Sequence, residues 1–98
     1  MKRLMPLGTI VMLDTENKSK LMIIGRLVKK SESENKIWDY CACSVPVGIT
    51  DNNLAFFDHN QVARLLFIGY QDEEEMQYSY ACKQYDNDSD SVSKKVEE

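Results

Sequence analysis

The apolar residues of this chain fall into short runs that are separated by polar segments. The central run is Lys20–Val28, KLMIIGRLV, in which four apolar residues stand together before a glycine. A run this short between polar turn residues is typical of a strand buried on both faces, because a helix usually needs ten or more residues. The pattern therefore predicts that this run is the central strand of a sheet.

Two further apolar runs flank the central strand along the chain. The earlier one, Leu7–Leu13, is rich in β-branched residues, and the residues between it and Lys20 are polar and turn-forming. We therefore predict a hairpin between the two runs, closed by an exposed six-residue loop. After Val28 the polar segment KKSESENK predicts a second solvated loop, and Ile37–Val45 then predicts a third strand.

The third predicted strand has two different faces. Trp38 and Tyr40 share one face, and Cys41 and Cys43 share the other, because side chains alternate along a strand. A Pro-Val-Gly turn ends this strand, and a short fourth strand is predicted over Leu54–Phe57.

Helix-start signals occur twice in the second half of the chain. The first is Asp58 with Gln61 three residues later, a capping-box pattern that predicts a short helical turn over residues 59–63. The apolar run Leu65–Ile68, closed by Gly69, predicts a fifth strand.

The second signal is Asp72, with Glu75 three residues later, and it predicts a helix from about residue 72 to about residue 84. The apolar residues of this helix form two stripes at helical spacing. One stripe contains Tyr78, Ala81, Cys82 and Tyr85, and the other contains Met76 and Tyr80. Because a small sheet covers one side of a helix, we expect Met76 and Tyr80 to face outward. The alternative is that Tyr80 is an ordinary surface tyrosine.

These elements predict an α+β fold: a curled antiparallel sheet or partly open barrel of about five strands, with a short helical turn and a C-terminal helix. Residues 1–85 form the single predicted domain, since a chain of 98 residues has room for one core. Residues 86–98 contain valine as their only apolar residue type, which predicts a disordered polar tail.

Charge is distributed unevenly around a formal net charge of −4. Residues 1–31 hold seven Lys and Arg against two acids, whereas residues 32–98 hold five against fourteen. The early basic residues are dispersed among turns and strand ends, so we do not expect a nucleic-acid partner.

No apolar run approaches the ~20 residues of a membrane helix, so we expect no membrane insertion. The N-terminus lacks a signal-peptide cleavage site, and we expect a cytoplasmic protein.

Residues that could carry chemistry are few. His59 with Cys41, Cys43 and Cys82 could form a zinc site, but the usual paired cysteine spacing is missing, and reduced, metal-free thiols fit better. His59 could also act as a general base beside Asp58, but no nucleophile or oxyanion motif accompanies it. The acidic run at residues 72–75 lacks the spacing of a calcium loop. We therefore predict no enzymatic activity, no metal and no cofactor.

The chain contains five pieces, in this order, that resemble a known family: LMPLGTIVML, KLMIIGR, WDY followed by a Pro-Val-Gly turn, FFDHNQV and FIGYQDEEE. Over roughly residues 4–76 it is similar to the small domain-of-unknown-function family encoded beside LXG polymorphic toxins and the type VIIb secretion system of Gram-positive bacteria. The resemblance implies a cytoplasmic accessory protein, a chaperone or targeting factor, that binds an LXG-type toxin or another secretion component. An immunity protein that neutralises a co-encoded toxin is the alternative, since such genes share these neighbourhoods.

A binding protein of this kind needs an adhesive surface, and the predicted C-terminal helix offers one. An outward apolar stripe beside an acidic helix start suits a client segment that alternates apolar and basic residues. Because basic residues are concentrated early in the chain, we expect the acids of residues 72–75 to lack a nearby Lys or Arg partner. A free sheet edge is the alternative site. The predicted partner-binding residues are Tyr70, Asp72, Glu73, Glu74, Met76 and Tyr80.

Overall fold

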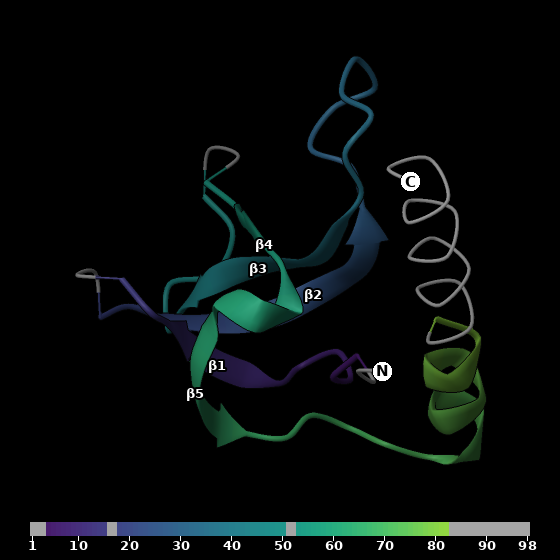
Figure 1. Cartoon of the computed structure of the whole chain (residues 1–98). Coiled ribbons are helices and arrows are strands. Elements are labelled where there is room, and N and C mark those ends of the chain that lie inside the picture. Colours follow the sequence, from purple (N-terminus) through teal and green to yellow (C-terminus); the bar gives the residue numbers. More distant parts are fainter. Residues whose placement is uncertain (1–3, 16–17, 51–52, 83–98) are drawn as a thin grey trace.

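The computed structural model describes residues 4–15, 18–50 and 53–82. It contains an open five-stranded antiparallel sheet with the strand order β4-β3-β2-β1-β5, a 3-10 turn and a C-terminal helix, so the predicted α+β fold is confirmed (Figure 1). The described part of the helix covers residues 73–82. The other elements are β1 Ile10–Leu13, β2 Lys20–Val28, β3 Trp38–Val45, β4 Ala55–Phe57, η1 His59–Gln61 and β5 Val62–Phe67.

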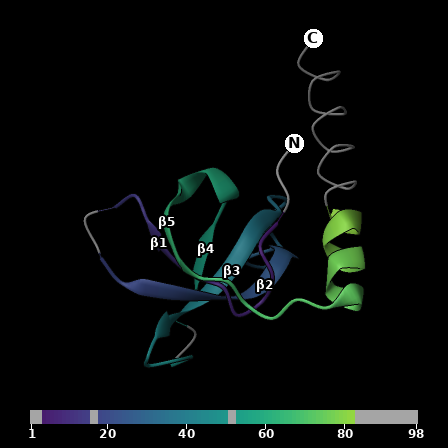
Figure 2. The ribbon, with the colours of Figure 1, turned by 90° about the horizontal axis from the view of Figure 1, so that it is seen from below.

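β2 is the central strand, as the sequence predicts, with β3 on one side and β1 on the other. Its burial is lower than expected for a strand covered on both faces. Ile23 is the only fully buried residue of the run Leu21–Ile24, and the other three are half-buried. The reason is that the sheet forms a single layer, and the helix stands beside one end of it rather than across a whole face (Figure 2).

Glycine conformation and pairing explain where β1 begins. The strand starts at Ile10 rather than at the predicted Leu7, because Gly8 adopts a φ of +88° and turns the chain there. From Ile10 onward β1 pairs with β2, which confirms the predicted hairpin. The described residues of both predicted polar loops are exposed. The predicted tail at residues 86–98 lies outside the described residues.

The segment between β4 and β5 also differs in length from the prediction. The capping box at Asp58 is present, with the Asp58 N–H donating to Gln61 Oε1 at 2.8 Å. The helical turn ends at Gln61, however, and does not extend to the predicted end at Ala63. Val62 returns to extended backbone and begins β5, which is therefore longer than the predicted strand at residues 65–68. β3 and β4 each begin one residue after the predicted start.

An irregularity in β2 determines where Arg26 points. Between Ile23 and Gly25, β2 contains one residue more than the facing part of β3, which is a β-bulge. A bulge shifts the alternation of side chains by one residue. Arg26, paired with Tyr40, therefore lies on the same face as Ile23 and is buried, with 8% of its surface exposed.

The core is small and lies on the face of the sheet that carries Ile23 and Tyr40. The Tyr40 and Phe57 rings pack with centroids 5.4 Å apart, so Tyr40, on the aromatic face of β3, points into the core. The buried core residues are Leu4, Val11, Ile23, Tyr40, Ala42, Phe57 and Cys82.

Among the described residues, no helix has the length and apolar content to cross a membrane.

Tyr40 links the core to two peripheral segments through its hydroxyl group. The Tyr40 oxygen accepts a hydrogen bond from the Met5 N–H at 3.0 Å and lies 2.6 Å from His59 Nδ1. Burial is the main cause that raises the pKa of Tyr40 to about 12. The neutral phenol is therefore the form that the folded protein stabilises.

We predict that Tyr40→Phe lowers the free energy of unfolding by about 1–2 kcal/mol at neutral pH, because the Met5 N–H loses its partner. The variant should also lose less stability in alkali. In the native protein the stabilisation of neutral Tyr40 is complete below pH 10 and is lost as pH rises towards 12. Urea denaturation at about pH 8 and about pH 11 tests this. Between these two pH values the native protein should lose about 1 kcal/mol more of its free energy of unfolding than the variant loses. An identical pH dependence in both proteins would contradict it.

Candidate protein-binding surface

The C-terminal helix begins at the residue that the sequence predicts. Asp72 Oδ1 accepts a hydrogen bond from the Glu75 N–H at 2.8 Å, and the Asp72 carbonyl accepts one from the Met76 N–H at 2.9 Å. Asp72 is therefore the N-cap residue, and it satisfies backbone donors that the first helical turn leaves open.

A buried ion pair fastens this helix to β2. Arg26 Nη1 lies 3.0 Å from Glu75 Oε2, 2.9 Å from Ser79 Oγ and 3.3 Å from the Met5 carbonyl oxygen. Ser79 Oγ in turn donates to Glu75 Oε2 at 2.7 Å. The Tyr78 ring covers the guanidinium group, with its centroid 4.8 Å from Cζ. The N-terminal segment, β2 and the helix therefore meet at one guanidinium group.

This contact corrects the prediction that the acids of residues 72–75 lack a basic partner. Arg26 is 49 residues away from Glu75 in the sequence, yet the two side chains form a largely buried pair. The β2 bulge is the physical reason, because it turns Arg26 from the opposite face of the strand to the face on which the helix packs.

The inward face of the helix is also more polar than the predicted apolar stripe. Of that stripe only Cys82 is buried, whereas Tyr78 is 51% exposed and Ala81 is exposed. The fourth member, Tyr85, lies outside the described residues. Ser79 and Glu75 take the inward positions instead, because the sheet presents a cation there.

The opposite face of the helix matches the prediction. Met76 is 53% exposed and Tyr80 is 62% exposed, so both point away from the domain. A shallow hollow of about 550 Å³ lies on this side, and we call it the outer helix surface. Its lining residues are Asp72, Glu73, Met76, Gln77 and Tyr80.

The remaining predicted binding residues line a second hollow, on the side of the helix that faces β2. This cleft has a volume of about 560 Å³, and Arg26 and Tyr78 belong to its lining. Tyr70, Asp72 and Glu74 are the predicted residues that line it. The six predicted residues therefore lie around one helix start but face two hollows that share Asp72.

The helix start is negatively charged and carries an ordered tyrosine. The Tyr70 hydroxyl donates a hydrogen bond to Asp72 Oδ2 at 3.0 Å. This hydrogen bond and the charge of the carboxylate raise the pKa of Tyr70. Glu73 and Glu74 are exposed beside it. The arrangement favours contact with a basic partner surface.

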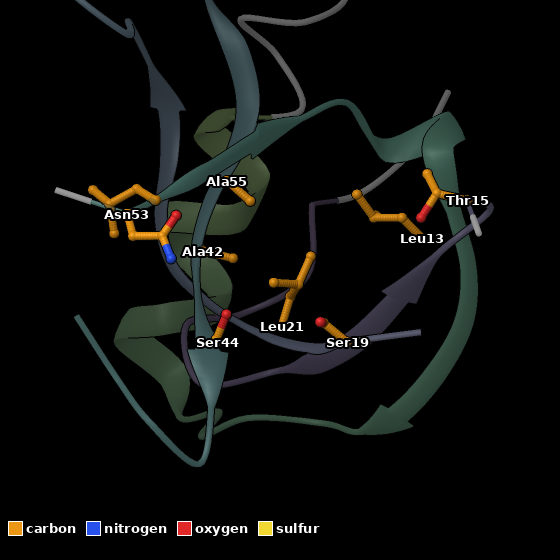
Figure 3. A pocket seen from close by; sticks show the side chains of 9 residues that line it. Leu13, Thr15, Ser19, Leu21, Ala42, Ser44, Asn53 and Ala55 are labelled. Atoms are coloured by element: carbon orange, nitrogen blue, oxygen red, sulfur yellow. The ribbon is translucent and has the colours of Figure 1, made fainter. Parts of the chain in front are cut away.

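A third hollow lies on the concave side of the sheet (Figure 3). Leu13, Leu21, Ala42 and Ala55 provide apolar walls, and hydroxyl and amide side chains surround them. Its volume is about 340 Å³. None of the described residues that line it is charged, so this part of the structure offers no titratable pair for acid and base catalysis there.

The candidate residues for catalysis or metal binding make contacts within the fold. The His59 N–H donates to Asp39 Oδ2 at 2.8 Å, and its ring contacts Tyr40. Cys41, Cys43 and Cys82 are free, buried thiols, and burial raises the pKa of Cys41, which disfavours the reactive thiolate. Within the part of the chain that the structure describes, no three His, Cys, Asp or Glu side chains converge as a metal site.

Sequence reasoning missed the exposure of β5. The strand is at the end of the sheet, and its apolar residues from Leu65 to Phe67 are exposed rather than buried. The apolar run Leu65–Ile68 predicts a strand but does not indicate that this strand lies at the edge of the sheet. Arg26 was also missed, because the bulge that buries it has no clear sequence signal.

Comparison with known proteins gives one match. A family model described as a domain of unknown function, DUF4176, matches residues 4–78. The chain belongs to this family. The match includes Arg26 and Glu75, whereas Tyr80 and Cys82 lie beyond it. No curated protein and no solved structure matches the chain.

We predict that Arg26→Met lowers the free energy of unfolding by about 3 kcal/mol, because the largely buried Glu75 carboxylate loses its contact with the Arg26 guanidinium group. The double variant Arg26→Met/Glu75→Leu should recover at least half of this loss, since it removes both charges. Glu74→Gln, which changes the exposed carboxylate next to Glu75 in the sequence, is the control and should change stability by less than about 0.5 kcal/mol.

Two measurements test the role of Arg26. Urea denaturation gives the free energies, and the rate at which a maleimide modifies Cys82 reports release of the helix. Cys82 should react faster in Arg26→Met than in the native protein. Equal stability and equal Cys82 reactivity in the two proteins would contradict the assigned role.

Proposed function

We propose that this protein is a non-enzymatic, cytoplasmic accessory protein that binds an LXG-type toxin as a chaperone or targeting factor for type VIIb secretion. The chain belongs to the family described as a domain of unknown function, DUF4176. The LXG toxin and the secretion system enter the proposal through the resemblance of the five sequence pieces. The chemistry of the outer helix surface supports the protein-binding part.

The observation that carries the binding proposal is the exposure of Met76 and Tyr80 on a helix whose opposite face is already docked. Met and Tyr are residue types favoured in protein interfaces, because Met adapts its shape and Tyr combines an apolar ring with a polar hydroxyl. Exposed carboxylates of Glu73 and Glu74 lie beside them. A client segment with apolar anchors and basic residues complements this surface.

The two kinds of contact have different roles in this proposal. Apolar anchors that become fully covered supply most of the binding free energy and mainly set the dissociation rate. Exposed charges at the rim attract the client over longer distances and mainly set the association rate. The acidic helix start therefore guides the encounter, and Met76 and Tyr80 hold the client.

We predict that Met76→Ala/Tyr80→Ala weakens toxin binding by well over tenfold, since truncating a central anchor costs about 2 kcal/mol or more. Charge reversal in Glu73→Lys/Glu74→Lys should instead mainly slow association and reduce its salt dependence. Surface plasmon resonance with the purified toxin at two salt concentrations measures both effects. Val47→Ala/Ile49→Ala is the matched control, because these apolar residues are equally exposed but lie in the turn after β3.

Binding at native affinity by the Met76→Ala/Tyr80→Ala variant would show that the client binds at another surface.

The part of the toxin that this protein binds distinguishes a targeting role from an immunity role. Binding to the LXG domain without loss of toxicity supports a targeting role. Binding to the toxic domain with loss of toxicity supports the immunity role instead.

A further inference from the structure

A patch of exposed apolar side chains lies along β5 and the residues that follow it. Leu7 joins the patch because Gly69 packs against the Leu7 carbonyl so closely that a Cβ there would collide with it. Contiguous apolar patches on monomeric proteins are usually small, and larger ones mark interaction sites. We call this surface the edge patch, and its exposed residues are Leu7, Leu65, Leu66, Phe67, Ile68 and Tyr70.

The position and the irregular pairing of β5 explain why so many consecutive residues are exposed. β5 is the last strand in the order β4-β3-β2-β1-β5, so one of its sides has no neighbouring strand in the described sheet. Its pairing with β1 shifts register twice, next to Ala63 and next to Leu66. These bulges break the strict alternation of faces, so apolar side chains emerge on both faces of the edge.

The two ends of the edge patch carry opposite charge. Arg64 is exposed at the end nearest η1, and the exposed carboxylates of Glu73 and Glu74 lie at the other end. A surface with a cation at one end, apolar residues in the middle and acids at the other end complements itself when a second copy lies antiparallel to it. This is the arrangement that a twofold axis produces.

We propose that the edge patch is the interface of a symmetric homodimer, in which two copies lie antiparallel along β5. Arg64 of each copy then approaches Glu73 and Glu74 of the other copy, and the apolar residues meet at the axis. The half-exposed side chains present on the order of 500 Å² per copy, so the dimer buries roughly 1,000 Å² in total. This area is at the lower end of specific interfaces, and the dimer is therefore weak and reversible.

Side chains rather than a backbone ladder hold the two copies together. β-bulges at a sheet edge disfavour regular pairing with another strand, and β5 contains two register shifts over six residues. The bulges do not prevent contacts between apolar side chains, because these side chains extend beyond the backbone on both faces. The contact therefore depends on Phe67 and its neighbours and on the end charges.

The first test is the oligomeric state of the full chain by sedimentation equilibrium, over roughly 1 µM to 1 mM. We expect a reversible monomer–dimer equilibrium with a dissociation constant of roughly 10–100 µM. Phe67→Glu should weaken it at least tenfold. Met76→Glu is the matched control, because Met76 is about as exposed as Phe67, 53% against 59%, but lies on the outer helix surface. It should leave the equilibrium unchanged.

The second test is a charge exchange that identifies the antiparallel arrangement. Arg64→Glu and Glu73→Lys/Glu74→Lys should each weaken the dimer several-fold, because each places like charges together. The triple variant should restore dimerisation towards the native constant. Far-ultraviolet circular dichroism and urea midpoints confirm that each variant is folded.

Three outcomes would overturn the proposal. The first is a monomer at every concentration. The second is a dimer that Phe67→Glu does not weaken or that Met76→Glu weakens equally, which would move the interface to the helix. The third is a triple variant that dimerises no better than the variants in which only one end is reversed, which would exclude the antiparallel arrangement.

Discussion

The guanidinium group of Arg26 is the contact on which the position of the helix depends. It joins β2, the Met5 carbonyl and the helix residues Glu75 and Ser79. Replacing a buried ion pair with apolar residues is often neutral for stability, but removing one of its charges is costly. The pair therefore contributes more to the orientation of the helix on the sheet than to the net stability of the fold. Cys82 is the only fully buried apolar residue on the described helix, so polar contacts decide how the helix sits.

The position of the helix in turn determines what the domain exposes. With Glu75, Ser79 and Cys82 facing the sheet, the helical repeat turns Met76 and Tyr80 outward. A helix rotated to bury the whole predicted stripe of Tyr78, Ala81 and Cys82 would instead turn Ser79 away from the sheet, and Arg26 would lose this partner. The contacts of Arg26 with Glu75 and Ser79 therefore favour the observed orientation, which leaves the outer helix surface exposed.

The sequence was sufficient for the class and order of the elements, because short apolar runs between polar loops leave few alternatives to a small antiparallel sheet. It also located both helix starts, since Asp58 and Asp72 act through contacts three residues away. Features that depend on pairing between distant segments were not predictable. The bulge in β2 reverses the face of Arg26, and the place of β5 in the sheet leaves Leu65 and Phe67 in solvent. Local patterns carry no information about either.

The candidate site divides in the same way. The outward position of Met76 and Tyr80 followed from helical periodicity and is confirmed. The prediction that the apolar inner stripe packs on the sheet was wrong. Apolar periodicity assumes that the facing sheet is apolar, whereas β2 presents a buried cation. Among the acids at the helix start, Asp72 caps the helix as predicted, whereas Glu75 is held by Arg26, and Glu73 and Glu74 are exposed.

The exposed acids connect the two proposed surfaces. Glu73 belongs to the lining of the outer helix surface and Glu74 to that of the adjoining cleft, and both lie at the acidic end of the edge patch. A basic client segment and Arg64 of a second copy would therefore require the same carboxylates. Two ligands that need one charged group weaken each other, and linkage requires the weakening to be equal in both directions. Dimerisation and client binding are consequently expected to oppose each other, so that a weak dimer covers the edge patch until a client replaces the second copy.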